Sequence, residues 1–239
     1  MRKMVEVFRY ELSSQLRRAS TLIYFAIVLG VCTPFLHMMS SGSRHEGMVL
    51  NAPFAVMEVV VFGSMLALLM VAAFAGDAAT RDFDARMHSL FYTSPVGKPA
   101  YVIGRFLGAF SLSALLLLAL PIGTLIATWT PFIPHERVGA FRAIAYLAPY
   151  LLFALANAFV ATAIAFGLAL MTRRTTASYA GAGFLFFFSM ICGKLLPTRI
   201  GWNAANLLDP LGYTAVQEIW LSTNALQKNA FVPSLHGAL

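Results

Sequence analysis

The sequence FLGAFSLSALLLLALPIGTLIAT, residues Phe106 to Thr128, contains no charged side chain. A hydrocarbon core about 30 Å thick is crossed by about 20 apolar residues in an α-helix, so residues 106–128 are long enough to span a bilayer. Backbone groups in lipid must be hydrogen-bonded internally, which favours helices over open strands. Four further apolar stretches have the same character, and we expect spans at residues 21–39, 54–75, 143–171 and 178–197. The sequence therefore predicts an all-α polytopic membrane protein.

The composition agrees with this fold class. Of the 239 residues, 59% are hydrophobic and 11% are charged, whereas soluble domains average about 45–50% apolar and about 25% charged residues. The formal net charge is +7, but the basic residues lie beside the predicted spans, so they give no support for nucleic-acid binding. The partner that the composition indicates is a lipid membrane.

The positions of lysine and arginine predict the orientation. Most of these residues lie before the first span, between the second and third, and between the fourth and fifth. Cytoplasmic flanks carry the excess of basic residues, so we expect a cytoplasmic amino terminus. This orientation puts Trp129, Trp202 and Trp220 on the outer side, where tryptophan is common at the membrane interface.

The two ends of the chain flank a predicted transmembrane domain at residues 21–200. In residues 1–20, the apolar side chains Val5, Phe8, Leu12 and Leu16 share one helical face. This predicts an amphipathic helix at the cytoplasmic interface, the alternative being a helix packed on the protein. Residues 201–239 carry charges that disfavour a span, so we expect an extracytoplasmic segment with short helices. Either the number of spans is odd, or the chain stops before a sixth span, which we prefer.

Several residues within the spans have a predicted role. Residues 143–171 exceed the length of a span, and we expect them to tilt or protrude rather than bend at Pro149. Asn157, in the middle of this stretch, is expected to hydrogen-bond across helices. Gly104 and Gly108 form a G-x-x-x-G step that predicts a close helix approach.

Two charged residues lie near the predicted outer ends of spans. Glu58 follows the start of the second span, and Lys194 precedes the end of the fifth. One interpretation is that both side chains extend to the interface. The other is that they pair and brace an outer gate, since charges within a membrane are usually paired or functional.

The predicted cytoplasmic loop at residues 77–100 contains a dense group of charges. Arg81, Asp84 and His88 are spaced by three and four residues and therefore share one face of a helix. An apolar stripe lies beside them, formed by Phe83, Met87, Leu90 and Phe91. A short amphipathic helix of this kind is suited to docking into a groove on a soluble partner. The alternative is a solvated connector, whose surface ion pairs contribute little.

This loop also resembles a known family. The matching residues are GDAATRDF (76–83), Met87-His88, LFYTSP (90–95) and YVIGR (101–105). They are similar to the coupling segment of permease subunits of type-two ATP-binding-cassette (ABC) exporters. They most resemble the subgroup of large permeases whose chains continue into a second permease half and a zinc aminopeptidase domain. The similarity covers residues 76–106, and the order of the spans extends it loosely to residues 1–200.

The resemblance implies a six-helix exporter permease bundle with an amino-terminal interfacial helix, located in the bacterial inner membrane. It implies that ATP and magnesium bind to a separate cytoplasmic ABC ATPase, which grips the loop helix. The second half of the transporter is then another permease domain or a second copy of this chain. The residues expected to couple the chain to the ATPase are Arg81, Asp82, Phe83, Asp84, Arg86, Met87, His88 and Leu90.

Two other functions stay open at this stage, a non-transporting membrane scaffold and an intramembrane enzyme. An enzyme would need paired catalytic groups at matching depth, for which Glu58 and Lys194 are the candidates. The chain lacks a His-Glu-x-x-His motif, so we expect no peptidase activity. Its histidines have no acidic or cysteine partners at metal-ligand spacing, so we expect no metal site and no cofactor in this chain.

Overall fold

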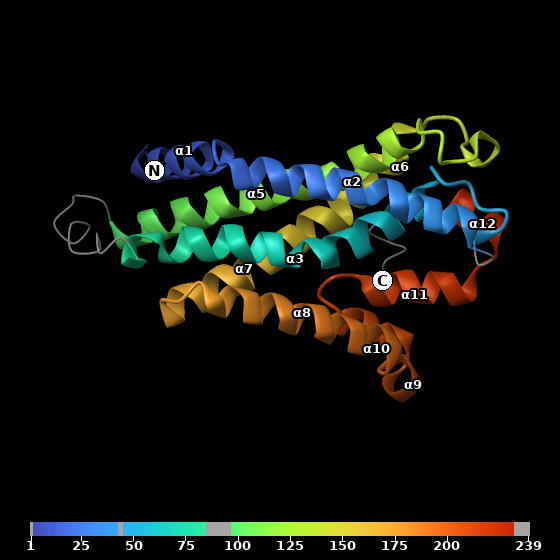
Figure 1. Ribbon diagram of the computed structural model, residues 1–239. Helices are drawn as coiled ribbons and strands as arrows, with labels where there is room; N and C mark the ends of the chain where they lie inside the picture. The colour runs from blue at the N-terminus through green and yellow to red at the C-terminus, as the bar shows by residue number, and fades with distance from the viewer. Residues whose placement is uncertain (1, 43–44, 85–96, 232–239) are drawn as a thin grey trace. The chain divides into compact units, whose positions relative to one another are not determined.

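The computed structural model describes residues 2–42, 45–84 and 97–231, except for the side chains of residues 2, 83 and 84 (Figure 1). These residues form helices and turns, and no strand occurs among them. Five helical segments are long and apolar enough to cross a membrane, which confirms the prediction of an all-α polytopic membrane protein. They are α2 (Ala19–Ser41), α3 (Pro53–Asp84), α5 (Lys98–Ala127), α6 (Ala143–Pro149) continued by α7 (Leu155–Thr172), and α8 (Thr176–Lys194).

Shorter helices precede and follow these segments. The first is α1 (Arg2–Leu16), within the predicted interfacial helix. A single 3-10 turn (His135–Arg137) lies between α5 and α6. The segment expected to contain short helices, residues 201–239, forms α10 (Trp202–Leu208), α11 (Tyr213–Ser222) and α12 (Ala225–Ala230), and a further short helix, α9 (Pro197–Ile200), precedes it.

The predicted loop at residues 77–100 is helical at both ends, which corrects its boundaries. Helix α3 does not stop at residue 75 but continues to Asp84, and α5 begins at Lys98 rather than at residue 106. An apolar helix that has already formed propagates at little cost, and the ion pair between Asp77 and Arg81, four residues apart, supports the added turns. The middle of the loop, residues 85–96, lies outside the described residues.

The fourth span is irregular at Pro149, where we expected no bend. Helix α6 ends at this proline, and a π-helical turn (Tyr150–Ala154) precedes α7. Proline has no N–H to donate, and its ring crowds the carbonyl four residues earlier, so regular α-helical bonding is interrupted there. The irregular turn thus follows the residue at which a bend was the alternative to tilt or protrusion.

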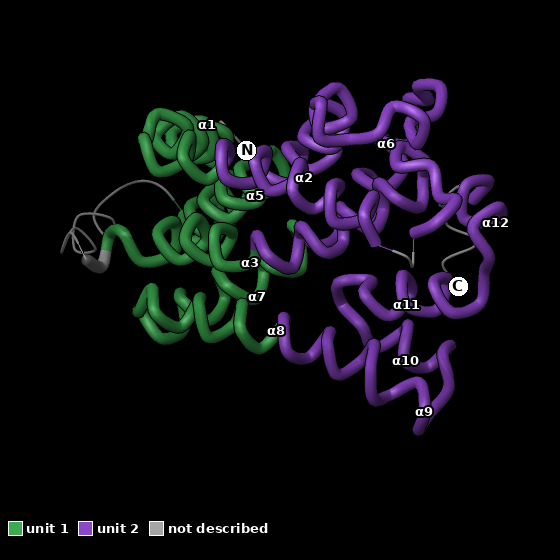
Figure 2. Tube along the Cα trace, turned by 45° about the vertical axis from the view of Figure 1, so that its right-hand side comes forward, with its two compact units in different colours: residues 1–24, 68–115, 158–185 green, residues 25–67, 116–157, 186–239 purple. Residues whose placement is uncertain are grey.

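The chain divides into two compact units, drawn in green and purple in Figure 2. Unit 1 contains residues 1–24, 68–115 and 158–185, and unit 2 contains residues 25–67, 116–157 and 186–239. In unit 1, Phe106 contacts Phe110, Phe159 and Phe166 with ring centroids 5.7–6.5 Å apart. In unit 2, a Cβ on Gly63 would lie 2.3 Å from a methyl carbon of Leu120. Both units are therefore packed through apolar side chains and small residues.

The carboxyl-terminal segment of unit 2 is held by buried polar groups. Asp209 accepts hydrogen bonds from Ser189 Oγ at 2.6 Å and from the backbone N–H of Thr214, in the first turn of α11, at 2.6 Å. Asn157 Nδ2 donates to the carbonyl oxygen of Leu211 at 3.1 Å. Asn157 thus makes the kind of buried hydrogen bond that we expected, although its partner is a loop rather than another spanning helix.

Candidate functional site

Helix α1 buries two polar side chains and leaves part of its apolar stripe exposed. Glu11 and Gln15 are each 1% exposed. In contrast, Val5 and Leu16, two members of the predicted apolar stripe, are 46% and 40% exposed. In water this arrangement would be unfavourable, since apolar side chains gain free energy by leaving water and buried charges need partners. Its outer surface therefore combines the apolar side chains of Val5 and Leu16 with exposed charges such as Arg9, while the carboxylate of Glu11 is buried.

Two glycines of α5 allow α1 to approach closely. A Cβ on Gly104 would lie 2.9 Å from the carbonyl oxygen of Met4, and one on Gly108 would lie 2.8 Å from Cγ of Glu11. The predicted packing role of this G-x-x-x-G step thus has a specific partner, the amino-terminal helix of the same chain. The close approach brings Glu11 within reach of cationic side chains on α3 and α5.

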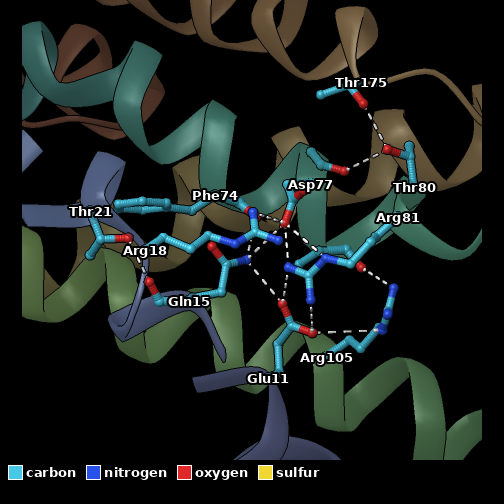
Figure 3. A network of polar contacts seen from close by, with 12 residues as sticks. Glu11, Gln15, Arg18, Thr21, Phe74, Asp77, Thr80, Arg81, Arg105 and Thr175 are labelled. Carbon is cyan, nitrogen blue, oxygen red and sulfur yellow. Dashed lines mark hydrogen bonds and ion pairs between the residues drawn. The ribbon is translucent and has the colours of Figure 1, made fainter. Parts of the chain in front are cut away.

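Arg81 of α3 binds two carboxylates, which are on different helices (Figure 3). Its guanidinium donates to both carboxylate oxygens of Glu11, at 3.0 and 3.3 Å. It also donates through Nε to Asp77 at 3.1 Å, one turn earlier on α3. Bidentate pairs of this kind fix the angle between the two groups as well as their distance. Arg81 therefore connects α1 to α3.

Arg105 of α5 extends the same network. It donates to the carbonyl oxygen of Ala78 and to a carboxylate oxygen of Asp82, each at 2.7 Å. Its Nε lies 3.8 Å from Glu11. Because Arg105 is buried, it depends on these partners for the hydrogen bonds that water would otherwise make. It thus connects α5 to the carboxyl-terminal end of α3.

Two residues at the end of α1 complete the network. Arg18 donates to Asp77 at 2.9 Å, and Gln15 donates to Glu11 at 2.9 Å. Thr21 Oγ1 donates to the carbonyl oxygen of Gln15 at 2.7 Å and so fixes the turn into α2. We call this group the α1–α3–α5 network: Glu11, Gln15, Arg18, Asp77, Arg81, Asp82 and Arg105. Its three arginines are balanced by three carboxylates.

The residues expected to bind an ATPase are placed as follows. Arg81 and Asp82 belong to the α1–α3–α5 network, with both side chains engaged in ion pairs inside unit 1. Phe83 and Asp84 are the last two residues of α3. The structure describes their backbone but not their side chains. The other four expected residues, Arg86, Met87, His88 and Leu90, lie outside the described residues.

A second polar cluster, in unit 2, corrects the predicted pair of Glu58 and Lys194. Glu58 is 6% exposed and does not extend to the surface. It accepts a hydrogen bond from Nε1 of Trp220 at 3.0 Å, and Nε2 of His45 lies 3.4 Å from its other oxygen. Lys194 is exposed, and no ion pair joins it to Glu58 within the described part of the chain.

Lys228 also contacts Trp220 in this cluster. Its Nζ is 3.7 Å from the centroid of the Trp220 ring and donates to the Trp220 carbonyl oxygen at 3.2 Å. Burial lowers the pKa of Lys228, and the nearby Glu58 carboxylate opposes this effect. His45, Trp220 and Lys228 were not expected from the sequence, because they come from loops and short helices without a periodic pattern.

Comparison of the chain with protein-family models and with curated proteins gives no match. The functional interpretation therefore depends on the residues and their geometry.

Proposed function

We propose that this chain is the transmembrane permease component of an ATP-driven ABC exporter. In this proposal, a separate cytoplasmic ATPase binds ATP and magnesium, and the chain converts ATP hydrolysis into movement of a substrate across the bacterial inner membrane. The five apolar spans and the resemblance of residues 76–106 support this role. The transporter is completed by a second permease half or by a second copy of the chain.

The observation that carries the proposal is the α1–α3–α5 network. Segment 85–96 connects the end of α3 to the start of α5, and the Arg105–Asp82 pair holds these two helix ends together at 2.7 Å. A partner that moves this segment therefore acts on both helices at once. Glu11 passes the displacement to α1, because it binds Arg81 at 3.0 Å and lies 3.8 Å from Arg105. Paired, buried charges resist separation and so transmit a displacement rather than absorb it.

The geometry changes the role that we assign to Arg81 and Asp82. Their side chains already bind Glu11 and Arg105, so exposing them to an ATPase would leave buried partners unpaired. In our proposal they transmit movement within unit 1 and do not form the docking surface. The contact with the ATPase is left to segment 85–96, which contains Met87 and His88. The positive-inside pattern puts this segment in the cytoplasm.

The experiment is purification of the tagged full chain from its native membranes, followed by reconstitution into lipid nanodiscs and measurement of ATP hydrolysis. We expect vanadate-sensitive hydrolysis by a co-purified ABC ATPase. Met87→Glu adds a charge to the expected docking stripe and should remove the ATPase from the preparation. The matched control is Arg174→Gln, an exposed position in another predicted cytoplasmic loop, which should retain it.

Two results would contradict the proposal. If no ATPase accompanies the wild-type chain, a scaffold or enzyme becomes the better assignment. If the ATPase co-purifies equally with wild type and with Met87→Glu, segment 85–96 is not where it binds.

A further inference from the structure

Unit 2 contains a groove between α5 and α6 that is not explained by the proposed transport role. Its apolar part has a volume of about 280 Å³ and is lined by α5 residues from Leu118 to Leu125 and by α6 residues including Leu147. The rings of Pro121 and Tyr146 lie along it, and Phe141 stacks on Tyr146 with centroids 5.6 Å apart. The groove thus has the polarity of the interior of a bilayer.

Two cavities adjoin the apolar groove through shared lining residues. The first has a volume of about 450 Å³ and shares Leu125, Phe141 and Tyr146 with the groove. The second, of about 210 Å³, shares Asn51 and Gly139 with the first and reaches Arg142. The lining therefore changes along its length from hydrocarbon to amide groups and a cation.

Arg142 is the charge available at the polar end. The amide of Asn51 is already used, since it donates to the Gly139 carbonyl at 2.7 Å and accepts from the Gly139 N–H at 2.8 Å. This pair fixes the backbone that leads to Arg142. The Arg142 side chain is exposed, and no carboxylate pairs with it among the residues that the structure describes. A guanidinium in this position is suited to a bidentate phosphate contact.

Tyr146 provides an independent sign of a missing partner. The residue is 8% exposed, and its hydroxyl is buried without a hydrogen-bond partner in the described part of the chain. Buried hydroxyls are normally satisfied, because leaving one unpaired in an apolar environment is costly. Since Tyr146 lines both the groove and the adjoining cavity, a molecule bound there could supply the acceptor.

We propose that this groove is a binding site for an anionic phospholipid, whose acyl chain lies along Pro121 and Leu147 and whose phosphate binds Arg142. An ester oxygen between chain and phosphate would accept a hydrogen bond from Tyr146. A phospholipid has the same order of polarity as the lining, and the guanidinium of Arg142 favours an anionic one. An apolar helix of a second copy would leave both Arg142 and the Tyr146 hydroxyl without a partner.

The test is native mass spectrometry of the purified full chain after exchange into micelles with equal phosphatidylglycerol and phosphatidylcholine. We expect one phosphatidylglycerol retained per chain in preference to phosphatidylcholine. Arg142→Gln should weaken this retention about tenfold, the effect of losing roughly 1.4 kcal/mol of charge-assisted hydrogen bonding. The control Arg199→Gln changes another exposed arginine of unit 2 and should leave retention unchanged.

A second pair of variants tests the apolar part. Ile122→Trp fills the groove and should abolish retention, whereas Ile191→Trp, outside the groove and equally exposed (45% against 44%), should not. Tyr146→Phe should stabilise the delipidated protein and weaken lipid retention, because it removes a hydroxyl that is satisfied only by the lipid.

Four outcomes would overturn the proposal: equal retention by Arg142→Gln and Arg199→Gln, unchanged retention by Ile122→Trp, displacement of the lipid by soluble glycerol phosphate, or a lipid-free dimer. The first result would show that Arg142 does not bind the phosphate, and the second would show that the acyl chain does not lie in the groove. The third assigns Arg142 to free anions, and the fourth assigns the groove to a second copy. None of these results depends on an ATPase, so the site is tested independently of the transport function.

Discussion

Removing the charge of Glu11 should detach α1 from the rest of unit 1. Glu11→Gln preserves the size of the side chain but leaves Arg81 and Arg105 without a shared carboxylate. Breaking a buried ion pair by removing one partner costs about 3–5 kcal/mol. Each arginine keeps a second carboxylate, Asp77 for Arg81 and Asp82 for Arg105, so we expect the lower end of this range, about 3 kcal/mol.

The assay is equilibrium unfolding of the purified chain in mixed micelles titrated with sodium dodecyl sulfate. Arg9→Gln, which removes an exposed charge from the same helix, is the control and should change stability by less than about 0.5 kcal/mol. Combining Glu11→Gln with Arg81→Gln should give a cost below the sum of the single variants, with a coupling of about 1 kcal/mol or more. Equal effects of Glu11→Gln and Arg9→Gln, or additivity of the double variant, would refute the reasoning.

Four further predictions use the same unfolding titration. Gly104→Ala should destabilise the chain by about 1–3 kcal/mol, because its Cβ would meet the backbone of α1. Gly167→Ala, which meets nothing within 4 Å, should stabilise α7 by up to about 1 kcal/mol. Asn157→Leu should cost about 1–3 kcal/mol, since it leaves the buried Leu211 carbonyl without its donor. The pKa of Lys228 is lower in the folded chain than in the unfolded chain, so the unfolded chain binds the ammonium proton more tightly. The stability of the wild type should therefore rise relative to that of Lys228→Met as the pH increases toward 10.5. A flat difference between these two proteins across alkaline pH would contradict the last prediction.

The sequence was sufficient to predict the spans because their signal is local. Twenty apolar residues without a charge have few alternatives to a membrane helix, and each predicted span corresponds to a helix of the structure. The residues at which these helices begin and end were less predictable. Asp77 and Arg81 ended the apolar pattern, yet the helix continued through them, since their ion pair and the helix already formed make further turns favourable.

The polar sites were predicted less well because their partners are distant in the chain. Glu58 and Asn157 were correctly singled out as polar groups inside apolar stretches, but their partners Trp220 and Leu211 lie in the irregular carboxyl-terminal segment. Glu11 was overlooked, because the expectation for α1 was based on its apolar side chains and not on the polar residues beside them. One signal was present: Glu11 and Gln15 are one turn apart, and both turn out to be buried.

The buried carboxylate of Glu11 determines how α1 is held in unit 1. The helix is held to α3 and α5 by charges that are worth most in a medium of low dielectric constant, and its exposed Val5 and Leu16 gain free energy only if lipid covers them. Both contributions therefore weaken together in water, and both strengthen at the membrane interface. Docking of α1 on α3 and α5 would therefore be favoured where lipid covers Val5 and Leu16, and a force that moves the ends of α3 and α5 also moves α1 through Glu11.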